Sequence, residues 1–486
     1  MNVQQAFTHG PATWLLVAML ATLSACTVGP AYQRPSAASP AFFKEAPEAD
    51  STWFPAAPAD TLERGPWWEL FGDPALTGLV EQVEVSNQNV AAAVAAYAQA
   101  QALVRQQRAG LFPSLALDAS ATRTGGHSRS GATSMQLGVG ASWEPDIWGQ
   151  LRLSVTSARA SAQASAANLA AARLSAQALL ATNYFALREA DNEIALLTSA
   201  VSAYERSLRI TKNQYDVGIA QLSDVLQAQT QLETTQANLI ATVGQRALFE
   251  HAIAVLVGKA PAELSVPVAP WNSKVPGVPL VVSSELLQRR PDVASAERAV
   301  AAANAQIGIQ RTAYFPSFVL SAFYGGEGAT LASLFRASNN IWSLGLSAAQ
   351  TLFDAGAIKA RVEGAQAARD ETVANYRQAV LNAFQSVEDQ LATIRSLAEQ
   401  DVQRRAASAD ADRNEQLTVN QYLQGQVAYT SVVIAQVTAL SARQTLSQLM
   451  YNRQAAAIAL IQALGGGWHA PREDEAATTS NASTSK

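Results

Sequence analysis

The sequence is poor in charge, in cysteine and in long apolar runs. Of its 486 residues only 15% are Asp, Glu, Lys or Arg, the net charge is -5, and there is one cysteine. A single cysteine excludes a disulfide framework and a zinc ribbon, and the slightly acidic balance excludes a basic protein that binds nucleic acid. The charged fraction lies below the roughly 25% of typical soluble domains. Alanine, leucine, serine and glutamine fill the difference, which favours packed helices with small residues at their contacts.

No arrangement of residues in the sequence points to an enzyme. The sequence has no phosphate-binding loop and no cluster with metal-ligand spacing, and His127, His251 and His469 are scattered along it. We therefore assign no catalytic, cofactor-binding or metal-binding residue, and we expect neither an enzyme nor a cofactor.

Beyond the amino-terminal region, no stretch of 18 apolar residues is free of charge. The nearest candidate, residues 239–257, contains Arg246 and Glu250. A transmembrane helix needs about 20 predominantly apolar residues. If the mature protein crosses a membrane, we expect it to do so with strands.

The amino terminus has the features of an export signal. Residues 14–23 form a short apolar stretch that leads into Leu23-Ser24-Ala25-Cys26, the pattern that precedes a lipid-modified cysteine. Residues 1–25 are therefore predicted to be a lipoprotein signal peptide, and Cys26 to carry lipid such as palmitate; the alternative is a buried core cysteine. No Lys or Arg precedes the apolar stretch, which leaves the start codon open. Thr27 follows the cysteine, as in lipoproteins sent to the outer membrane of a Gram-negative cell.

The chain is predicted to be internally duplicated. A shift of 207 residues aligns Tyr215-Asp216-Val217-Gly218 with Tyr422-Leu423-Gln424-Gly425, and Gly258 with Gly465. We expect a first repeat at 26–258, a crossover linker at 259–283 that contains five prolines, and a second repeat at 284–465. Residues 466–486, rich in Ser, Thr and Ala, are predicted to be disordered.

Apolar residues recur at alternating steps of three and four, which predicts long helices with heptad seams. The longest are expected at 150–214 and 357–421, each of 65 residues and therefore about 98 Å long. Shorter helices are expected at 86–110, 221–257, 291–313 and 428–464. Laid end to end, two shorter helices match one long helix in each repeat. One predicted seam comprises Leu222, Val225, Gln229, Leu232, Gln236, Leu239 and Val243, and its counterpart comprises Tyr429, Val432, Gln436, Ala439, Arg443, Leu446 and Met450.

Four segments alternate between apolar and polar residues, which predicts strands at 115–122, 136–143, 318–325 and 342–349. Their loops, 125–134 and 326–340, are expected to face outside. Four such strands are more often half of a soluble sandwich, but helices of this length do not suit one, and strands of about 9 to 12 residues are long enough to cross a bilayer. Four strands cannot close a membrane barrel alone, so several copies must share one. A dimer, a trimer and a tetramer remain open at this point.

An ordered set of motifs resembles the TolC-like outer membrane factors, and among them the efflux lipoproteins of the OprM and NodT type. The match covers nearly the whole mature chain. Its segments are Cys26-Thr27-Val28-Gly29-Pro30-Ala31-Tyr32-Gln33-Arg34-Pro35, Trp67-Trp68-Glu69-Leu70-Phe71-Gly72-Asp73-Pro74-Ala75-Leu76, Arg289-Arg290-Pro291-Asp292-Val293, Asn304-Ala305-Gln306-Ile307-Gly308 before Phe315-Pro316-Ser317, and Gln350-Thr351-Leu352-Phe353-Asp354-Ala355-Gly356.

Most of these motifs have a structural explanation. Asp73-Pro74 is typical of a helix N-cap with proline at the first helical position, and Pro291 of another helix start. Phe112-Pro113 and Phe315-Pro316 are expected to end a helix and begin a strand, because proline removes a donor. Gly149 and Gly356 are expected at the return from strand to helix.

The resemblance implies an α+β fold with a long α-helical barrel and a transmembrane β-barrel. Each protomer would contribute four strands to the 12-strand barrel of a homotrimer, with an equatorial segment at the start of the first repeat. The implied location is the outer membrane, with a lipid anchor and a long periplasmic tunnel. The implied partners are a periplasmic membrane fusion (adaptor) protein and an inner-membrane pump of the RND type, and the implied function is export of small molecules such as drugs.

The resemblance also implies a periplasmic gate at the helix tips, where the family has Tyr-x-x-Gly. Here these residues are Tyr215 with Gly218 and Tyr422 with Gly425. The alternative for both tyrosines is plain seam packing. Some relatives place an acidic ring after the second glycine, but Ser431 and Ile434 stand there.

Asp216 and Asp224, next to the first glycine, could instead form a weaker ring, or be solvated charges at helix ends. The hypothesis is that Asp216, Asp224 and Tyr422 line the constriction. Two other functions remain as alternatives: the exit duct of an ABC-dependent type I protein secretion system, and an envelope spacer that does not conduct.

Overall fold

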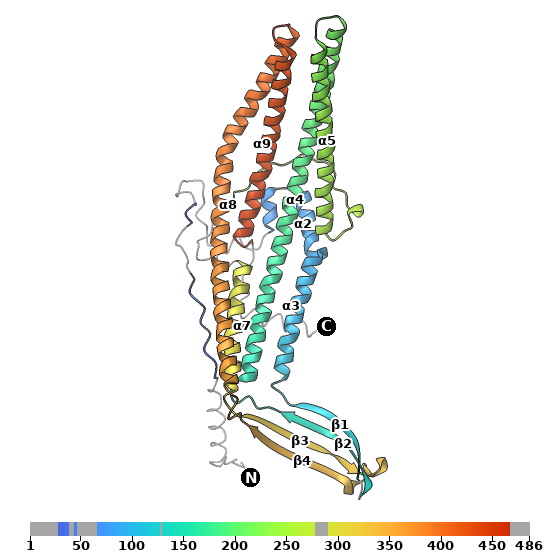
Figure 1. Cartoon of the computed structure of the whole chain (residues 1–486), viewed down its shortest axis with the longest axis vertical. Helices are drawn as coiled ribbons and strands as arrows, with labels where there is room; N and C mark the ends of the chain where they lie inside the picture. Colours follow the sequence, from blue (N-terminus) through green and yellow to red (C-terminus); the bar gives the residue numbers. More distant parts are fainter. Residues whose placement is uncertain (1–27, 38–42, 46–65, 127–128, 278–289, 467–486) are drawn as a thin grey trace, which may run out of the picture. The chain divides into compact units, whose positions relative to one another are not determined.

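The computed structural model describes residues 28–37, 43–45, 66–126, 129–277 and 290–466. The predicted signal peptide, Cys26 and the carboxy-terminal tail after residue 466 lie outside the described residues. The chain divides into two compact units: residues 1–36, 96–166 and 295–377 contain the strands, and residues 37–95, 167–294 and 378–486 contain the helix tips. The four strands and the paired helices of the two halves can be followed in Figure 1.

The same order of elements occurs twice along the chain. The first half contains α2 (Pro74–Ser86), α3 (Gln88–Ala109), β1 (Ser114–Gly126), β2 (Arg129–Trp143), α4 (Gln150–Asp216) and α5 (Leu222–Leu256). The second contains α7 (Pro291–Thr312), β3 (Ser317–Gly328), β4 (Asn340–Ala349), α8 (Ala357–Leu423) and α9 (Tyr429–Ala463). Helices α4 and α8 have 67 residues each, and α5 and α9 have 35 each. The six predicted long helices are confirmed, with ends displaced by one to two residues.

The helix starts follow the predicted chemistry. Asp73 accepts hydrogen bonds from the N–H groups of Ala75 and Leu76, and Pro74 is the first residue of α2. Pro291 is the first residue of α7. The glycines before α4 and α8 have φ of 82° and 90°, left-handed values that favour glycine. Helix α3 begins two residues later than predicted, after Asn87, whose buried side chain caps it.

Short helices meet end to end, as expected. The Asn87 side chain donates to the carbonyl of Leu256 at the end of α5, at 2.8 Å, and Gly258 lies against the backbone of Ser86. In the second half, the Arg290 guanidinium donates to the carbonyl of Ala463 at the end of α9, also at 2.8 Å. Polar groups therefore satisfy the carbonyls that a helix end leaves without partners.

The main apolar core lies where η1 (Trp67–Phe71), α2, the middle of α4 and the ends of α5 and α9 meet. Its fully buried members include Phe71, Leu76, Tyr184, Ile253 and Ile458. The segment after α5 packs on this core through partly buried side chains, among them Trp271, whose indole N–H donates to Gln454 on α9 at 3.0 Å. The described part of the proline-rich linker is thus fixed to both halves.

Buried charges hold the linker in place. Asp191 on α4 accepts from the guanidinium groups of Arg188, at 3.0 Å, and Arg246, at 2.6 Å. The two arginines also donate to the linker carbonyls of Pro267 and Val266, each at 2.7 Å. A buried charge is stable only when it is paired and hydrogen-bonded, and here the pairing fastens α4, α5 and the linker together.

The four strands form one antiparallel sheet in the order β1-β2-β3-β4. Strands β2 and β3 belong to different halves, yet they pair from Met135 with Gly328 to Trp143 with Leu320. Strands β1 and β4 are the edges of the sheet within this chain. The first hairpin is longer than predicted, because β1 extends to Gly126 and β2 begins at Arg129, so most of the predicted loop 125–134 is strand.

Most apolar side chains of the strands lie on one face, whereas Val319 and Phe323 of β3 and Ile341 of β4 lie on the other. This apolar face contains Leu115, Leu117, Ala119, Leu137, Val139, Ala141, Trp143, Leu320, Ala322, Tyr324, Trp342, Leu344 and Leu346. The opposite polar face contains Asp118, Ser120, Gln136, Gly138, Gly140, Ser142, Ser321, Phe323, Gly325, Glu327, Ser343, Gly345 and Ser347. On the apolar face, Leu117, Leu344 and Trp342 are 74%, 74% and 76% exposed. Exposed apolar surface of this extent indicates a membrane or another chain as its neighbour.

Of the seven predicted seam residues of each helix, five are buried in α9 and two in α5. Tyr429, Val432 and Gln436 of α9 are buried. In α5, Val225 and Leu232 are buried, but the second row of buried residues is Ala228 and Thr235 in place of the predicted Gln229 and Gln236. The exposed flank of α5 contains Leu222, Leu226, Ile240, Val243, Leu248 and Val255.

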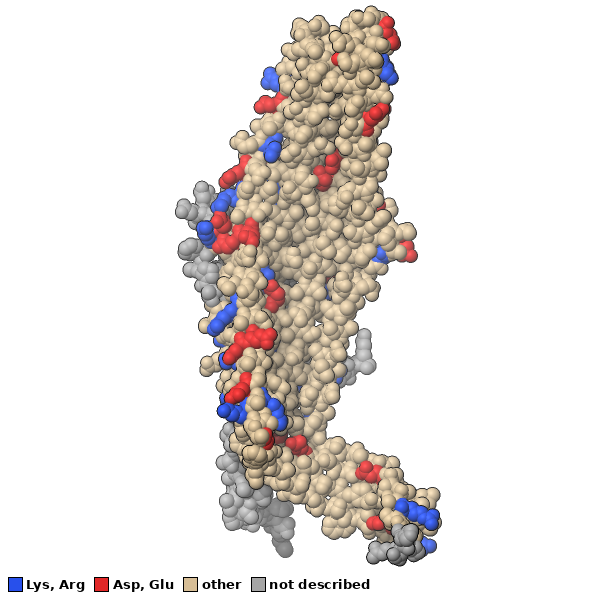
Figure 2. All heavy atoms as spheres, in the orientation of Figure 1, with Lys and Arg blue, Asp and Glu red and all other residues tan. Residues whose placement is uncertain are grey.

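Among the described residues, α5 is the one helix long and apolar enough to cross a membrane by length and composition. It carries Arg246 and Glu250, which form an ion pair with each other at 3.3 Å. Since α5 also packs on α4 and the linker through these charges, we interpret it as a helix of the protein core. In Figure 2 charged side chains are scattered along the helices, and most of the visible strand surface carries none.

Candidate gate at the helix tips

Two turns with the same backbone hydrogen bonds connect α4 to α5 and α8 to α9. In the first, the N–H of Gly218 donates to the carbonyl of Tyr215 at 2.9 Å, and that of Ile219 to Gln214 at 2.7 Å. In the second, Gly425 donates to Tyr422 and Gln426 to Gln421, both at 2.9 Å. This is the Schellman arrangement, which closes a helix around a left-handed residue.

Glycine is required at both turns for its backbone. Gly218 and Gly425 have φ of 79° and 75°. A Cβ atom would meet nothing within 4 Å at either position, so it is the left-handed conformation and not crowding that selects glycine. The two Tyr-x-x-Gly motifs are therefore tight helix-helix turns, which is the structural role expected from the sequence.

Tyr422 joins the two helical hairpins. Its hydroxyl donates to the Gln214 side chain at the end of α4, and its ring lies 5.4 Å from the ring of Tyr429. Burial raises the pKa of Tyr422, and the negative charge of Asp224 raises it further. Because a neutral tyrosine keeps its proton as a donor, this contact persists at physiological pH.

A small buried cluster supports Tyr422 from below. Tyr429, Val432 and Ala228 are buried together and are contacted by Leu208 and Val419. Burial raises the pKa of Tyr429 to about 12. The cluster combines residues of α4, α5, α8 and α9, so the two hairpins are packed against each other at their tips.

The other predicted residues of the constriction are placed differently. Tyr215 is 43% exposed, and Asp216, the last residue of α4, is exposed and forms no salt bridge with any described residue. The Asp224 carboxylate accepts from the N–H of Gln221 at 3.3 Å, which is a helix cap. The structure thus brings Tyr422 and Asp224 into one environment but adds no contact between Tyr422 and Asp216.

Sequence reasoning missed Gln214 as the partner of Tyr422. Gln214 precedes the first tyrosine and aligns with Gln421 at the 207-residue shift, so its position in the repeat was visible. Its role was not, because the hydrogen bond joins residues separated by 208 positions.

The two turns differ in polarity. The first exposes Val217 and Ile219, which are 69% and 75% exposed. The corresponding residues of the second turn are Gln424 and Gln426. The first turn therefore presents two exposed apolar side chains beside its glycine, whereas the second presents Leu423, which is 56% exposed, next to two glutamines.

Residues 28–36, at the described start of the chain, lie in the strand-containing unit. The Tyr32 hydroxyl donates to Glu297 on α7, and the Asn304 side chain donates to the carbonyl of Pro30 at 3.0 Å. Burial and the contact with Glu297 raise the pKa of Tyr32. A Cβ atom at Gly308 would be 2.8 Å from the Cα of Gly29, so α7 and the segment touch through their backbones.

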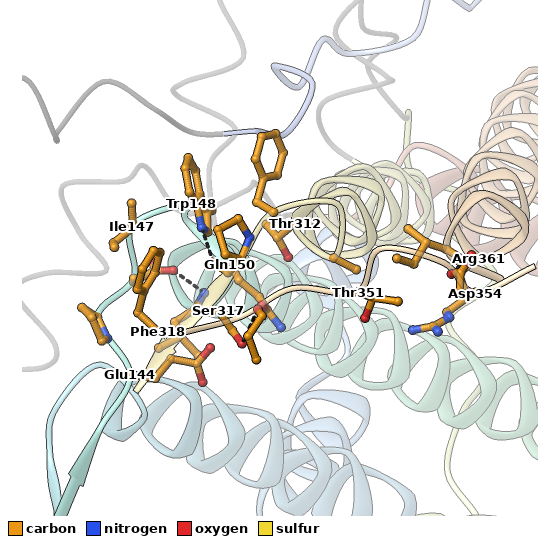
Figure 3. Close-up of a pocket in the computed structure, with 18 residues that line it drawn as sticks. Glu144, Ile147, Trp148, Gln150, Thr312, Ser317, Phe318, Thr351, Asp354 and Arg361 are labelled. Atoms are coloured by element: carbon orange, nitrogen blue, oxygen red, sulfur yellow. Dashed lines mark hydrogen bonds between the residues drawn. The ribbon is translucent and has the colours of Figure 1, made fainter. Parts of the chain in front are cut away.

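A cleft of about 230 Å³ lies where the strands turn back into helices. Figure 3 shows Trp148 on one side of the cleft and Asp354 with Arg361 on the other. The Trp148 indole donates to the carbonyl of Pro316 at 2.7 Å, and the Asp354 carboxylate accepts from the N–H groups of Gly356 and Ile358, which lowers its pKa. These contacts cap α8 and fix the junction, so the cleft has a structural explanation. The described residues contain no group of three or more potential metal ligands.

Comparisons with known proteins agree on one family. The family described as outer membrane efflux protein matches residues 79–259 and 282–466. The toluene efflux pump outer membrane protein TtgC of Pseudomonas putida is 30% identical over 92% of this chain and 94% of its own length. The pyoverdine export outer membrane protein OpmQ of Pseudomonas aeruginosa is 32% identical over 87% of this chain and 92% of its own length. The solved structure of the outer-membrane channel OprN has a TM-score of 0.83 at 29% identity and covers 91% of this chain and 100% of OprN.

The two matched segments correspond to the two halves of the fold. Each matched segment spans one half of the chain, with its strands and its tip turn. Relatives and structural neighbour alike align over most of their length and are named as outer membrane proteins. The chain belongs to the outer membrane efflux protein family, and it is an efflux channel of the outer membrane and not an enzyme.

Proposed function

We propose that three copies of this chain form one channel, with a shared 12-strand barrel in the outer membrane and a helical tunnel in the periplasm. The observation that supports this most strongly is the four-stranded sheet with an exposed apolar face and two unpaired edges. In lipid an open sheet edge leaves N–H and C=O groups without partners, so the sheet must be closed by other copies. Three copies of four strands give a barrel of common size.

The exposed flank of α5 supports the same assembly. Leu226, Ile240 and Val255 are 55%, 72% and 63% exposed in the single chain. Contact with a neighbouring copy would remove this apolar surface from water. Native mass spectrometry of the detergent-solubilised protein tests the assembly: three copies are expected, and two or four copies would overturn the proposal.

We infer that the two repeats, 26–258 and 284–465, arose by duplication, with 259–283 as the linker. The equal lengths of α4 and α8 and of α5 and α9 support this inference. So does the identical hydrogen bonding of the two tip turns.

We further propose that Cys26 is the lipid anchor. Gly29 touches Gly308, which lies in the last two turns of α7, and α7 leads directly into β3. Gly29 lies three positions after Cys26, a reach of about 10 Å. A lipidated cysteine would therefore lie near the beginning of the strands, at the periplasmic surface of the outer membrane. Metabolic labelling with palmitate should mark the protein, and Cys26→Ser should abolish the label.

For the gate, we propose that Tyr215, Asp216, Gly218, Asp224, Tyr422 and Gly425 line the constriction and that Tyr422 keeps it closed. The hydrogen bond from Tyr422 to Gln214 supports this assignment, since it ties α8 to α4 beside the turns. Tyr422→Phe should raise single-channel conductance in planar bilayers. Tyr215→Phe, the same change at the matched position, should leave conductance unaltered. Equal conductance in both variants and the natural protein would overturn the assignment.

We propose that the apolar first turn docks on a periplasmic adaptor protein, which recruits an inner-membrane pump of the RND type, and that the cargo is a small molecule. The names of TtgC and OpmQ, which refer to toluene and pyoverdine, support a small cargo. A photo-crosslinking residue at position 219 should capture the adaptor, and the same residue at 426 should capture less. Capture of an adaptor with an RND pump is expected; capture of an ABC exporter would favour protein secretion, and capture of neither, with no conductance, would favour a spacer.

A further inference from the structure

On the polar face of the sheet, two side chains lie over glycines of β2. The Asp118 carboxylate, on β1, points across β2, so that its Oδ2 atom lies 2.5 Å from the place that a Cβ of residue 140 would occupy. The Phe323 ring, on β3, covers Gly138 in the same way, and Gly138 is buried although it lies on an open sheet. Both side chains are thus held flat against the sheet by the absence of side chains on β2.

The register explains why they converge. Asp118 pairs with Gly138, and Phe323 pairs with Gly140. Each side chain leans diagonally, so that Asp118 lies over Gly140 and Phe323 lies over Gly138. Diagonal cross-strand neighbours are within reach of aromatic and long side chains, and an aromatic ring over a glycine is a known stabilising arrangement of sheets. A side chain at position 138 would push the Phe323 ring away from the sheet, and a side chain at position 140 would push the Asp118 carboxylate away.

The polar face is also charged with one sign. Its described charged side chains are Asp118 and Glu327, and Glu327 accepts a hydrogen bond from Ser134 at 2.9 Å. Arg123 belongs to the opposite set of β1 positions, together with Leu117 and Ala121. Carboxylates on a wall that encloses water raise the local concentration of cations.

We propose that Asp118, held against the wall by Gly140, makes this stretch of the exit conduit selective for cationic solutes, while Phe323 over Gly138 forms its apolar neighbour without narrowing the bore. The proposal rests on the proposed function, in which the polar face lines a water-filled conduit. It assigns a specificity-determining residue to the strands, separate from the helix tips.

The experiment uses the one-cysteine chain, in which lipidated Cys26 leaves no competing thiol. Ala116→Cys lies on the polar face two residues from Asp118, about 7 Å away, and pairs with Gly140, so the Asp118 carboxylate leans toward it. Impermeant methanethiosulfonate reagents that carry an ammonium or a sulfonate group are added to cells from outside, and the two reaction rates are compared. The rate at Ala116→Cys reports the local potential, whatever the state of the gate.

The ratio of the ammonium to the sulfonate rate should exceed that of a free thiol in solution. Asp118→Asn should lower this ratio about 2- to 7-fold, the range given by one charge at 7 Å with and without screening by salt. Ser321→Cys is the matched control on the same face, four residues further along the sheet and two strands away, where Asp118→Asn should change the ratio little. An unchanged ratio at Ala116→Cys would overturn the proposal.

Two further variants separate this inference from the proposed function. If Ala116→Cys reacts with neither reagent, the polar face is not in water and the conduit itself is wrong. Gly140→Ala should alter the ratio because its Cβ meets only the Asp118 side chain, whereas at Gly138 a Cβ would also meet the carbonyl oxygen of Tyr324 at 2.6 Å. In the Asp118→Asn background Gly140→Ala should change nothing further; an equal effect in both backgrounds would contradict the role of Asp118.

Discussion

Helices α5 and α9 occupy the same place in the two halves and have the same length of 35 residues, but they are buried to different degrees. In α5 7 residues are buried, and in α9 16. Positions related by the 207-residue shift diverge: Leu222 and Val243 of α5 are about half exposed, whereas Tyr429 and Met450 of α9 are buried.

The neighbours of the two helices explain the difference. Helix α9 hydrogen-bonds to α4 through Ser447, to α8 through Arg443 and to the linker through Gln454. Helix α5 packs on α4 and the linker and leaves one flank open within the chain. A heptad pattern therefore tells which residues of a helix can pack, but the topology decides how many of its faces find a partner. Three pairs of substitutions and one pH profile test this comparison.

The largest effect is expected in the core of α9. Ile458 is 2% exposed, and its counterpart at the 207-residue shift is His251, which is exposed. Ile458→Ala should lower the free energy of unfolding by about 2–5 kcal/mol, because it leaves a cavity in a packed core. His251→Ala should change it by less than about 0.5 kcal/mol. Chemical denaturation of the full chain in detergent, followed by helical circular dichroism, measures both. Similar losses would mean that α5 and α9 are equally packed.

The next comparison concerns Arg246 and Arg453, which also match at the shift of 207. Arg246→Ala leaves the buried Asp191 with one arginine and frees the linker carbonyl of Val266, so we expect a loss of about 3 kcal/mol. Arg453→Ala leaves Asp401 paired with the more exposed Arg405 and should cost about 1 kcal/mol. The same denaturation assay applies. A larger loss for Arg453 would show that the charged contact of α5 is not what fixes the linker.

Alkaline pH should loosen the tip of α9. The pKa of Tyr429 is raised to about 12 by burial and by the neighbouring Tyr422 and Tyr204. The raised pKa means that the folded state favours the neutral form of Tyr429. The contribution of Tyr429 to the stability of the fold is therefore complete below pH 10 and is lost as the pH rises from 10 to 12. The difference in free energy of unfolding between the natural protein and Tyr429→Phe should change by about 2 kcal/mol between pH 10 and pH 12. If the free energies of unfolding of the two proteins depend on pH in the same way, Tyr429 is not the group responsible. Leu222, the counterpart in α5, has no titratable group.

The smallest effect is expected at the helix starts. Asp224→Ala removes the cap of α5 and should lower stability by about 0.5–1 kcal/mol. Ser431→Ala, the matched change in α9, should lower it less, since the first residues of α9 have no side-chain cap. Thermal denaturation of the full chain compares the two. If Asp224→Ala also changes cation selectivity in bilayers while stability is unaltered, Asp224 acts in the gate and not as a cap.

The sequence predicted the local structure well where one residue type determines the conformation. Proline at 74 and 291, glycine at 218 and 425, and the strand alternation around Leu117 and Leu344 each gave the right element. It failed in the first hairpin, where Gly126 and Arg129 continue the strands. There the pairing of β1 with β2 extends beyond the residues that alternate.

By itself, the sequence determined helices, caps, turns, the two faces of the strands and the family, because these depend on the properties and spacing of neighbouring residues. Only the tertiary structure decided that β2 pairs with β3, that Tyr422 reaches Gln214, and that Asp118 lies over Gly140. Each of these contacts joins separate elements, and Tyr422 and Gln214 are 208 residues apart. Such contacts form only when the whole chain has chosen one packing among several that the same local patterns allow.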